Sequence, residues 1–470
     1  MAEQRTGFVR KSLMRLSWPL LVVTVLTLLA ALGNVIVLSI ASPELNAAVA
    51  TANQMLGVVY DVSVLFSIGA LVVIAQQLGA GRSQVAAQSS RSALRASTAL
   101  GVVLALVVVA FGPTVLRLIN TPEGLIGDAL AYLWVVSLGL VFNAYIVAAT
   151  AVLRAYGRTP AILVLAIVVN LVDVLLLAVF VLVLDLGVVG AALPTLIVRG
   201  IGVLILVWLL RSRTGVTMFR ALRGAEPEVG AHAGPGVVRD GRRPLVSMIK
   251  ISIPTVLENG AYNLAIVATL SLINVLGSDA INARSYALTL TALVTGVILA
   301  LAQGNETIVG WDFGARDLTR AKLLTLRTAL GTALAAALLA ALLWWFAEPA
   351  LSIFGAGDDI VAMAQGALAV SIVLLPLSAA TTIVYGALRS AGDVLVPMIY
   401  SIAASAIVLV PLSWLLVGQL GLGLPGLFWA LAGHEAVRAA LMTGRWLRGS
   451  WTRREPVSAP AGVPAVMEPQ

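Results

Sequence analysis

Long runs of apolar residues organise this chain. Each of twelve runs holds about 20 or more mostly apolar residues, enough for an α-helix to cross the roughly 30 Å hydrocarbon core of a bilayer. Hydrophobic residues make up 60% of the 470 residues and charged residues 11%, which is too little charge to cover a soluble protein of this length. We therefore predict an all-α integral membrane protein with transmembrane helices at 16–41, 50–77, 92–118, 126–152, 161–185, 189–210, 250–275, 283–308, 325–346, 360–388, 397–417 and 424–446.

The basic residues lie almost wholly on one side of these spans. All but four of the 30 Lys and Arg residues fall near the two ends of the chain or in every second connection, the exceptions being Arg117, Arg199, Arg284 and Arg438. Because cytoplasmic connections carry the excess of Lys and Arg, we expect an inner-membrane protein with both termini in the cytoplasm. The net charge of +8 then follows from topology, so the expected partner is the lipid bilayer and not a nucleic acid.

Several classes of protein are excluded by what the sequence lacks. The chain has no Cys, and its two His residues, His232 and His434, are too few for a His-based metal centre. It has no nucleotide-binding loop of the Gly-x-x-x-x-Gly-Lys type and no nucleophile motif. We expect no enzymatic activity, no resident cofactor and no ATP binding, so an H⁺ or Na⁺ gradient must supply the energy for secondary transport.

The two halves of the chain share landmarks at a nearly constant offset of 235–236 residues. The matched positions include Pro19 and Pro254, Gly79 and Gly314, Pro113 and Pro349, Arg154 and Arg389, and Gly190 and Gly426. Each half holds six spans, an even number, so both halves enter the membrane from the same side and form parallel bundles.

This duplication predicts five parts. They are a cytoplasmic N-terminus (1–15), an N-lobe (16–210), a cytoplasmic linker (211–249), a C-lobe (250–447) and a disordered cytoplasmic tail (448–470). The linker is rich in Gly and Arg and contains three prolines, and the tail is rich in Pro and Ala.

Short motifs recur in the connections of both halves. "QQLGAGR" at Gln76–Arg82 has a counterpart in "GWDFGAR" at Gly310–Arg316, and "VLRAYGRT" at Val152–Thr159 has one in "ALRSAGD" at Ala387–Asp393; "LGVVGAALPT" occupies Leu186–Thr195. In their order and spacing, these motifs make the chain resemble the MATE (multidrug and toxic compound extrusion) family of the flippase-like MOP superfamily. A major-facilitator transporter would share twelve spans in parallel halves, but its Gly-x-x-x-Asp-Arg-x-Gly-Arg-Arg-like loop is missing between the second and third spans.

The resemblance implies a particular architecture and activity. Two six-helix bundles would surround a central cleft, and alternating access would be driven by a proton or sodium gradient. The substrates would be amphipathic, often cationic, organic compounds that are exported from the cell. We expect the transporter to be a monomer.

Carboxylates inside the spans are costly and tend to mark ion or substrate pathways. Asp61 lies near the middle of the second span, where desolvation favours the protonated form that a proton carrier needs. A hydrogen bond that joins two packed helices is the alternative. Asp173 lies half-way along the fifth span, three residues after Asn170. We expect Asp61, Asp173 and Asn170 to belong to the ion-coupling region.

The resemblance assigns further positions in the N-lobe. It places Asp173 where the family usually has an Asn, puts Leu177 at the family's own acidic position, and matches Thr195 to a polar position that faces the same interior. It also places Asn34 where the family commonly carries an ion-binding Asp. Asn34 can coordinate an ion but cannot carry a proton, so proton coupling through the N-lobe would require Asp61 or Asp173.

Glu258 is the expected carboxylate of the C-lobe, one turn after Pro254. Sodium-coupled members of the family have a Glu on this span and an Asp on the tenth, but here Ser378 stands near the second acidic position. A sodium site needs several oxygens, and this lobe offers only part of that set, so a possible Na⁺ site stays open. A location close to the cytoplasmic surface is the alternative for Glu258.

The remaining charges of the spans are expected to be structural. Glu306 and Arg284 lie close to the two ends of the eighth span and can extend to water. Glu435 and Arg438 are three residues apart on the last span and are expected to pair. Next to them, His434 is expected to be packed, and Arg199 to reach a polar partner inside its own lobe.

Aromatic and acidic residues favour a cationic substrate. Tyr60, Tyr145 and Tyr262 lie within spans and can offer their ring faces to a cation. We expect these three residues and Ser378 to line the substrate cavity. The spans hold more acids than bases, whereas a flippase for a lipid-linked glycan or another lipid head group would need a strongly cationic cavity. We therefore predict an ion-coupled exporter of small amphipathic compounds, with such a flippase as the alternative.

Overall fold

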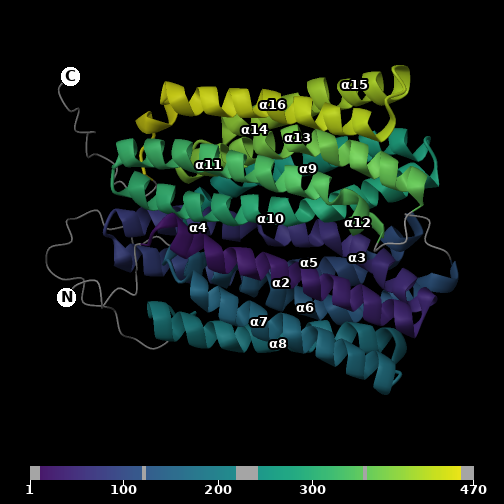
Figure 1. Cartoon of the computed structure of the whole chain (residues 1–470). Helices are drawn as coiled ribbons and strands as arrows, with labels where there is room; N and C mark the ends of the chain where they lie inside the picture. The colour runs from purple at the N-terminus through teal and green to yellow at the C-terminus, as the bar shows by residue number, and fades with distance from the viewer. Residues whose placement is uncertain (1–10, 119–122, 219–241, 353–356, 457–470) are drawn as a thin grey trace, which may run out of the picture. The chain divides into compact units, whose positions relative to one another are not determined.

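Helices make up the architecture of the chain (Figure 1). The structure is a computed structural model that describes residues 11–118, 123–218, 242–352 and 357–456, with no β-strand among them. Its first half contains α2 (Leu13–Ala41), α3 (Pro43–Ser63), α4 (Leu65–Gly79), α5 (Ser83–Leu118), α6 (Glu123–Ala155), α7 (Thr159–Ala178), the π-helical segment η1 (Val179–Val183) and α8 (Gly187–Thr214). Its second half contains α9 (Arg242–Asn274), α10 (Ser278–Gly314), α11 (Leu318–Trp345), α12 (Ala347–Ser352), α13 (Asp358–Ser390), α14 (Leu395–Ala404), η3 (Ser405–Leu409), α15 (Val410–Ser413), η4 (Trp414–Gln419), α16 (Gly423–Arg448) and η5 (Ser450–Arg453).

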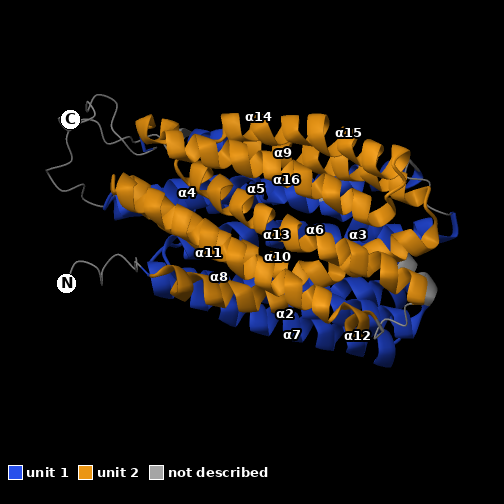
Figure 2. Cartoon of the chain, turned by 45° about the horizontal axis from the view of Figure 1, so that its top comes forward, with its two compact units in different colours: residues 1–11, 26–252, 455–470 blue, residues 12–25, 253–454 orange. Residues whose placement is uncertain are grey.

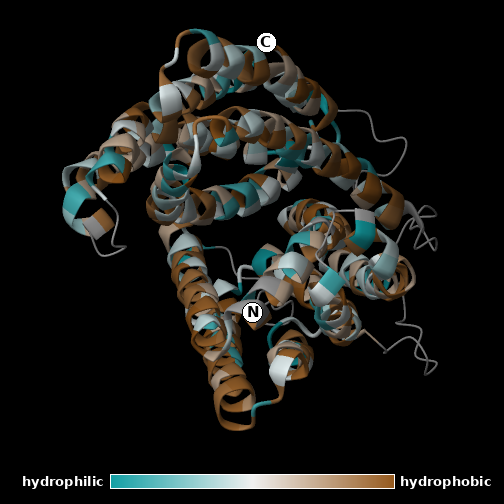
Figure 3. Cartoon of the chain, turned by 90° about the vertical axis from the view of Figure 1, so that its right-hand side faces the viewer, coloured by the Kyte–Doolittle hydropathy of each residue, from teal (hydrophilic) through white to brown (hydrophobic). Residues whose placement is uncertain are grey.

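The predicted spans all coincide with helices. Eleven helical segments of the described residues are long and apolar enough to cross a membrane. The twelfth predicted span, 424–446, coincides with α16, whose interior carries His434, Glu435 and Arg438 and is therefore less apolar. Apolar residues occupy most of the helices in Figure 3. Leu204 and Leu264, for example, are 72% and 73% exposed, as expected for side chains that face lipid.

Local sequence explains where several helices begin and bend. Ser42 caps α3 by accepting a hydrogen bond from the Leu45 amide over 3.2 Å, and Pro43 supplies the first helical residue. Asp317 caps α11 in the same way through the Arg320 amide over 3.1 Å. Prolines stand inside five long helices, where each removes one backbone hydrogen bond: Pro19, Pro113, Pro194, Pro254 and Pro376.

Two irregular features lie within the spans. The second span, predicted as one helix, is divided at Val64 into α3 and α4. The π-helical segment η1 precedes α8 by a few residues, and η4 precedes α16 at the repeat-related position. The two halves of the chain therefore share a π-helical segment at corresponding positions, in addition to the matched Gly and Pro residues.

The chain folds into two compact units (Figure 2). Unit 1 consists of residues 1–11, 26–252 and 455–470, and unit 2 of residues 12–25 and 253–454. Two helices are divided between the units. The start of α2 belongs to unit 2 and the rest of α2 to unit 1, whereas the start of α9 belongs to unit 1 and the rest of α9 to unit 2. The lobe boundaries at 16–210 and 250–447 stay a prediction. Most of the predicted linker, together with most of the predicted tail, lies outside the described residues.

Candidate functional site

A small polar cavity lies inside unit 1. It has a volume of about 60 Å³ and is lined by Asn34, Leu38, Val49, Asn53, Tyr132, Asp173, Leu177, Ala191, Pro194 and Thr195. The lining side chains come from α2, α3, α6, α7 and α8, so five helices enclose a space that holds one carboxylate and several neutral polar groups.

Asn34 and Asp173 meet in this cavity. The Asn34 side-chain amide donates a hydrogen bond to Oδ2 of Asp173 over 2.8 Å. The amide oxygen of Asn34 is buried and accepts no hydrogen bond from the described residues. The amide nitrogen of Asn34 is thus used by the carboxylate, whereas its oxygen can still accept a hydrogen bond from a water or another donor, or coordinate a cation. The predicted residues Asn34, Asp173 and Thr195 are therefore brought together.

A second polar group lies near the cavity. Arg199 on α8 donates to the Tyr60 hydroxyl over 2.8 Å, and its guanidinium carbon lies 5.0 Å from the centre of the Tyr60 ring. Tyr132 donates to Asn53 over 3.4 Å. The prediction that Arg199 finds a polar partner is confirmed, and the partner is a hydroxyl and not a carboxylate. Sequence reasoning did not single out Asn53 or Tyr132.

Three other predicted residues lie elsewhere. Asp61 is exposed on α3 and forms no hydrogen bond or ion pair with another described residue. Asn170 donates to the Ala166 carbonyl of its own helix over 2.9 Å. Tyr145 is buried in α6, 5% exposed. None of the three lines the cavity, so their roles in coupling or substrate binding stay predictions.

Unit 2 contains a buried cluster of charges. Arg438 on α16 donates to Glu258 on α9 over 2.7 Å and to Glu435 over 2.9 Å. Its Nε donates to the Ser401 hydroxyl over 3.1 Å. Glu258 and Glu435 are only 5% and 7% exposed, and Glu258 lies more than four turns into α9. The predicted Glu435–Arg438 pair is confirmed, and it extends to Glu258.

His434 and two aromatic residues border this cluster. His434 is fully buried, its Nε2 lies 3.2 Å from the Ser405 hydroxyl, and its Nδ1 lies 3.5 Å from Oε1 of Glu435. The ring of Tyr262 stacks on that of His434 at 5.7 Å. Tyr385 on α13 is close to Glu258 and donates to Thr255 over 3.4 Å. The expected packing of His434 is confirmed, with Tyr262 as one of its neighbours.

The expected placement of Glu306 is wrong. Glu306 is 4% exposed and forms an ion pair with Arg389 over 2.8 Å, while its backbone carbonyl accepts from the Ser390 hydroxyl. The reason is that α10 continues to Gly314, so Glu306 lies inside the helix and faces α13. Ser378, in turn, only accepts a hydrogen bond from Thr382 through its backbone carbonyl.

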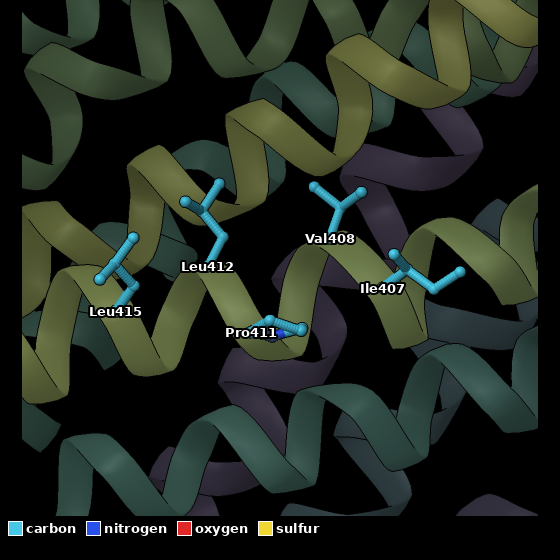
Figure 4. A pocket seen from close by; sticks show the side chains of 5 residues that line it. All are labelled: Ile407, Val408, Pro411, Leu412 and Leu415. Atoms are coloured by element: carbon cyan, nitrogen blue, oxygen red, sulfur yellow. The ribbon is translucent and has the colours of Figure 1, made fainter.

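Neither polar region forms a transition-metal site. The described residues contain no group of three or more His, Asp or Glu side chains placed to hold a metal ion. A larger hollow of about 280 Å³ lies on α15 and the adjoining π-helical segments and is lined only by Ile407, Val408, Pro411, Leu412 and Leu415 (Figure 4). With no polar lining, it resembles the helix surfaces that lipid chains cover and carries no chemistry.

Buried charges within a duplicated set of long apolar helices define a polytopic transport protein. The chain matches the family described as MatE over residues 19–179 and 254–415, two segments that start at the repeat-related prolines. It therefore belongs to the MATE family of multidrug transporters. The predicted family is confirmed.

Relatives extend over almost the whole chain. The uncharacterized transporter YisQ of Bacillus subtilis is 26% identical over 450 residues, covering 94% of this chain and 95% of the relative. The probable multidrug resistance protein NorM of Thermotoga maritima is 22% identical over 454 residues, covering 95% and 94%.

Solved structures show the same fold. The outward-facing structure of a multidrug resistance MATE transporter of the MOP superfamily matches with a TM-score of 0.82 at 20% identity, covering 94% of this chain and 96% of that one. A MOP superfamily transporter from Pyrococcus furiosus matches with a TM-score of 0.83 at 20% identity and the same coverage. The predicted fold, twelve transmembrane helices in two six-helix bundles, is confirmed.

Proposed function

We propose that the protein is an antiporter that exports small amphipathic, cationic organic compounds by alternating access in exchange for H⁺ or Na⁺. The observation that carries this proposal is the Asn34–Asp173 pair in the cavity of unit 1. A carboxylate inside a membrane protein that forms no ion pair tends to bind a proton or a cation. The hydrogen-bond donor to Asp173 is the neutral amide of Asn34 over 2.8 Å. Arg199 is near enough for its charge to act on Asp173, but its guanidinium donates to the Tyr60 hydroxyl and forms no ion pair with the carboxylate.

The composition of the cavity supports export of cations over lipid flipping. Its lining includes one acid, Asp173, and no basic residue, whereas binding of a phosphate-linked lipid would require basic groups. The relatives described as multidrug resistance proteins support the same class of substrate. Lys and Arg in the connections support an inward orientation of both termini.

Transport in proteoliposomes tests this proposal. Purified protein would be reconstituted with ethidium as a fluorescent cation, and a proton gradient or a sodium gradient would be imposed separately. We expect one of the two gradients to accelerate ethidium movement at least tenfold and Asp173→Asn to abolish that acceleration. Asp128→Asn, the same chemical change at an exposed residue of α6, is the matched control. Ethidium movement that responds to neither gradient would refute ion-coupled export.

A further inference from the structure

We infer that unit 1, at the end where α8 stops, binds the head group of an anionic phospholipid between Arg158 and Arg213. Arg158 lies in the turn between α6 and α7 and directly precedes α7, and Arg213 lies in the last turn of α8. The two guanidinium groups are near enough for their charges to act on each other. The inference concerns lipid binding alone and does not depend on the proposed function.

Further arginines gather at the same end of unit 1. Arg91 on α5 lies near Tyr156, in the turn that also holds Arg158. Arg95 on α5 donates two hydrogen bonds to the Met218 carbonyl over 2.9 and 3.2 Å, and Met218 follows α8. These contacts bring the start of α5, the turn after α6 and the end of α8 together, so several positive charges share one surface.

The helices that form this end supply no carboxylate. Residues 65–118, 129–172 and 186–218 contain no Asp or Glu. Glu455, which unit 1 also includes, directly follows Arg454 of unit 2 and lies outside these segments. Burial lowers the pKa of Arg158 below its ordinary value, and the charge of Arg213 lowers it further. Positive charges that approach one another in this way favour the binding of an anion.

The repeat-related end of unit 2 has its own counter-charge. Asp393 follows Arg158 by 235 residues, so an acid occupies the position at which unit 1 has an arginine. Asp393 pairs with Arg445 over 2.6 Å and with Arg454 over 3.0 Å. In unit 1, an anion from outside the chain would supply the negative charge that Asp393 supplies in unit 2.

Apolar side chains adjoin these arginines and identify the anion as a lipid. Leu204 and Trp208 on α8 are 72% and 62% exposed, and Arg213 follows Trp208 by five residues, or about 7.5 Å along the helix. Val164 is exposed on α7, which packs against α8. A phospholipid has an anionic phosphate next to hydrocarbon chains, and it matches this sequence of apolar and basic groups better than a soluble anion does.

Native mass spectrometry of the detergent-solubilised protein tests the inference. The protein would be titrated with dimyristoyl phosphatidylglycerol, which is anionic, and separately with dimyristoyl phosphatidylcholine, which is zwitterionic. We expect phosphatidylglycerol to bind more tightly. Arg158→Gln and Arg213→Gln should each weaken its binding about fivefold, as expected for the loss of one basic group near an anionic lipid. Binding of phosphatidylcholine should be the same in both variants as in the unchanged protein.

The repeat supplies a matched control. Arg448 follows Arg213 by 235 residues and lies in the last turn of α16. Arg448→Gln should leave the binding of phosphatidylglycerol unchanged, because the carboxylate of Asp393 lies at that end of unit 2. Arg213→Lys keeps the charge and should retain the preference for phosphatidylglycerol. Size-exclusion profiles verify that each variant is folded.

Three outcomes would overturn the inference. Binding of phosphatidylglycerol that neither Arg158→Gln nor Arg213→Gln weakens would remove the site. Equal weakening in Arg448→Gln and Arg213→Gln would show that the lipid responds only to net charge. Displacement of phosphatidylglycerol by an equal concentration of inorganic phosphate would assign the arginines to a soluble anion. Ethidium transport enters none of these measurements, so each outcome leaves the proposed function to its own test.

Discussion

The backbone N–H of Gly69 in α4 donates to the hydroxyl oxygen of Ser252 in α9 over 2.9 Å, and both groups are buried. The repeat-related residues meet as well: a Cβ on Gly304 would collide with the hydroxyl of Ser17. Gly304 follows Gly69 by 235 residues, and Ser252 follows Ser17 by the same number. The two helices that contain Pro19 and Pro254, α2 and α9, are thus each packed through a serine against a glycine, of α10 and α4 respectively.

Gly69→Ala should destabilise the protein through steric overlap. A Cβ at this position would lie 2.5 Å from Met248 Cα and 2.7 Å from its carbonyl carbon, and backbone cannot move aside as a flexible side chain can. We expect a cost of about 1–3 kcal/mol, measured as a lower temperature of unfolding in detergent.

Gly57→Ala is the control for this variant, because a Cβ on Gly57 in α3 would meet no atom within 4 Å. It should leave the unfolding temperature unchanged or raise it slightly, since Ala has the higher helix propensity. Equal losses in the two variants would mean that close approach to Met248 is not the cause.

The positions of the amide and the carboxylate in the unit 1 cavity should be exchangeable. Asp173→Asn removes the carboxylate and should reduce gradient-driven ethidium transport at least tenfold. The double variant Asn34→Asp/Asp173→Asn restores one carboxylate and one amide at hydrogen-bond distance, so a substantial part of the transport should return. No recovery in a folded double variant would show that the carboxylate must come from α7.

Tyr60→Phe should weaken unit 1 by removing the acceptor of Arg199. The hydroxyl accepts from the guanidinium over 2.8 Å, while Nη1 of Arg199 is already buried without a partner among the described residues. Loss of a hydrogen bond to a charged group costs about 1.5–3 kcal/mol, visible in thermal unfolding. Tyr60→Leu, which also removes the ring face 5.0 Å from the guanidinium, should cost more; equal effects would indicate that only the hydroxyl matters.

Much of the fold could be predicted because lipid imposes it. Apolar runs long enough to cross a bilayer must be helical, and a pair such as Glu435–Arg438 follows from a spacing of three residues on one helix. Contacts across the sequence could not be predicted in this way. Asn34 and Asp173 are 139 residues apart and Glu258 and Arg438 are 180 apart, and no local pattern brings them together.

The error on Glu306 has a similar origin. Hydropathy sets the end of the eighth span at 308, but α10 continues to Gly314, and the polar residues Asn305 and Asp312 near its end are fully buried. In the sequence, polar residues at the end of a span suggest a membrane–water interface. In the structure, Glu306 is buried because Arg389 on α13 pairs with its carboxylate.

Asp393→Asn should destabilise the end of unit 2 that follows α13. Asp393 closes the "ALRSAGD" motif; its side chain is fully buried and accepts from Arg445 over 2.6 and 3.0 Å and from Arg454 over 3.0 Å. The carboxylate thereby links the turn after α13 to α16 and to the residue after η5. Replacing it leaves two guanidinium groups without their counter-charge, and breaking such a buried pair costs about 3–5 kcal/mol. Arg454→Ala removes only the half-exposed partner of Asp393. Its loss of unfolding free energy, measured by thermal unfolding, should be less than half that of Asp393→Asn. Equal losses in the two variants would place the main stabilisation in the Arg454 contact and not in the two hydrogen bonds from Arg445.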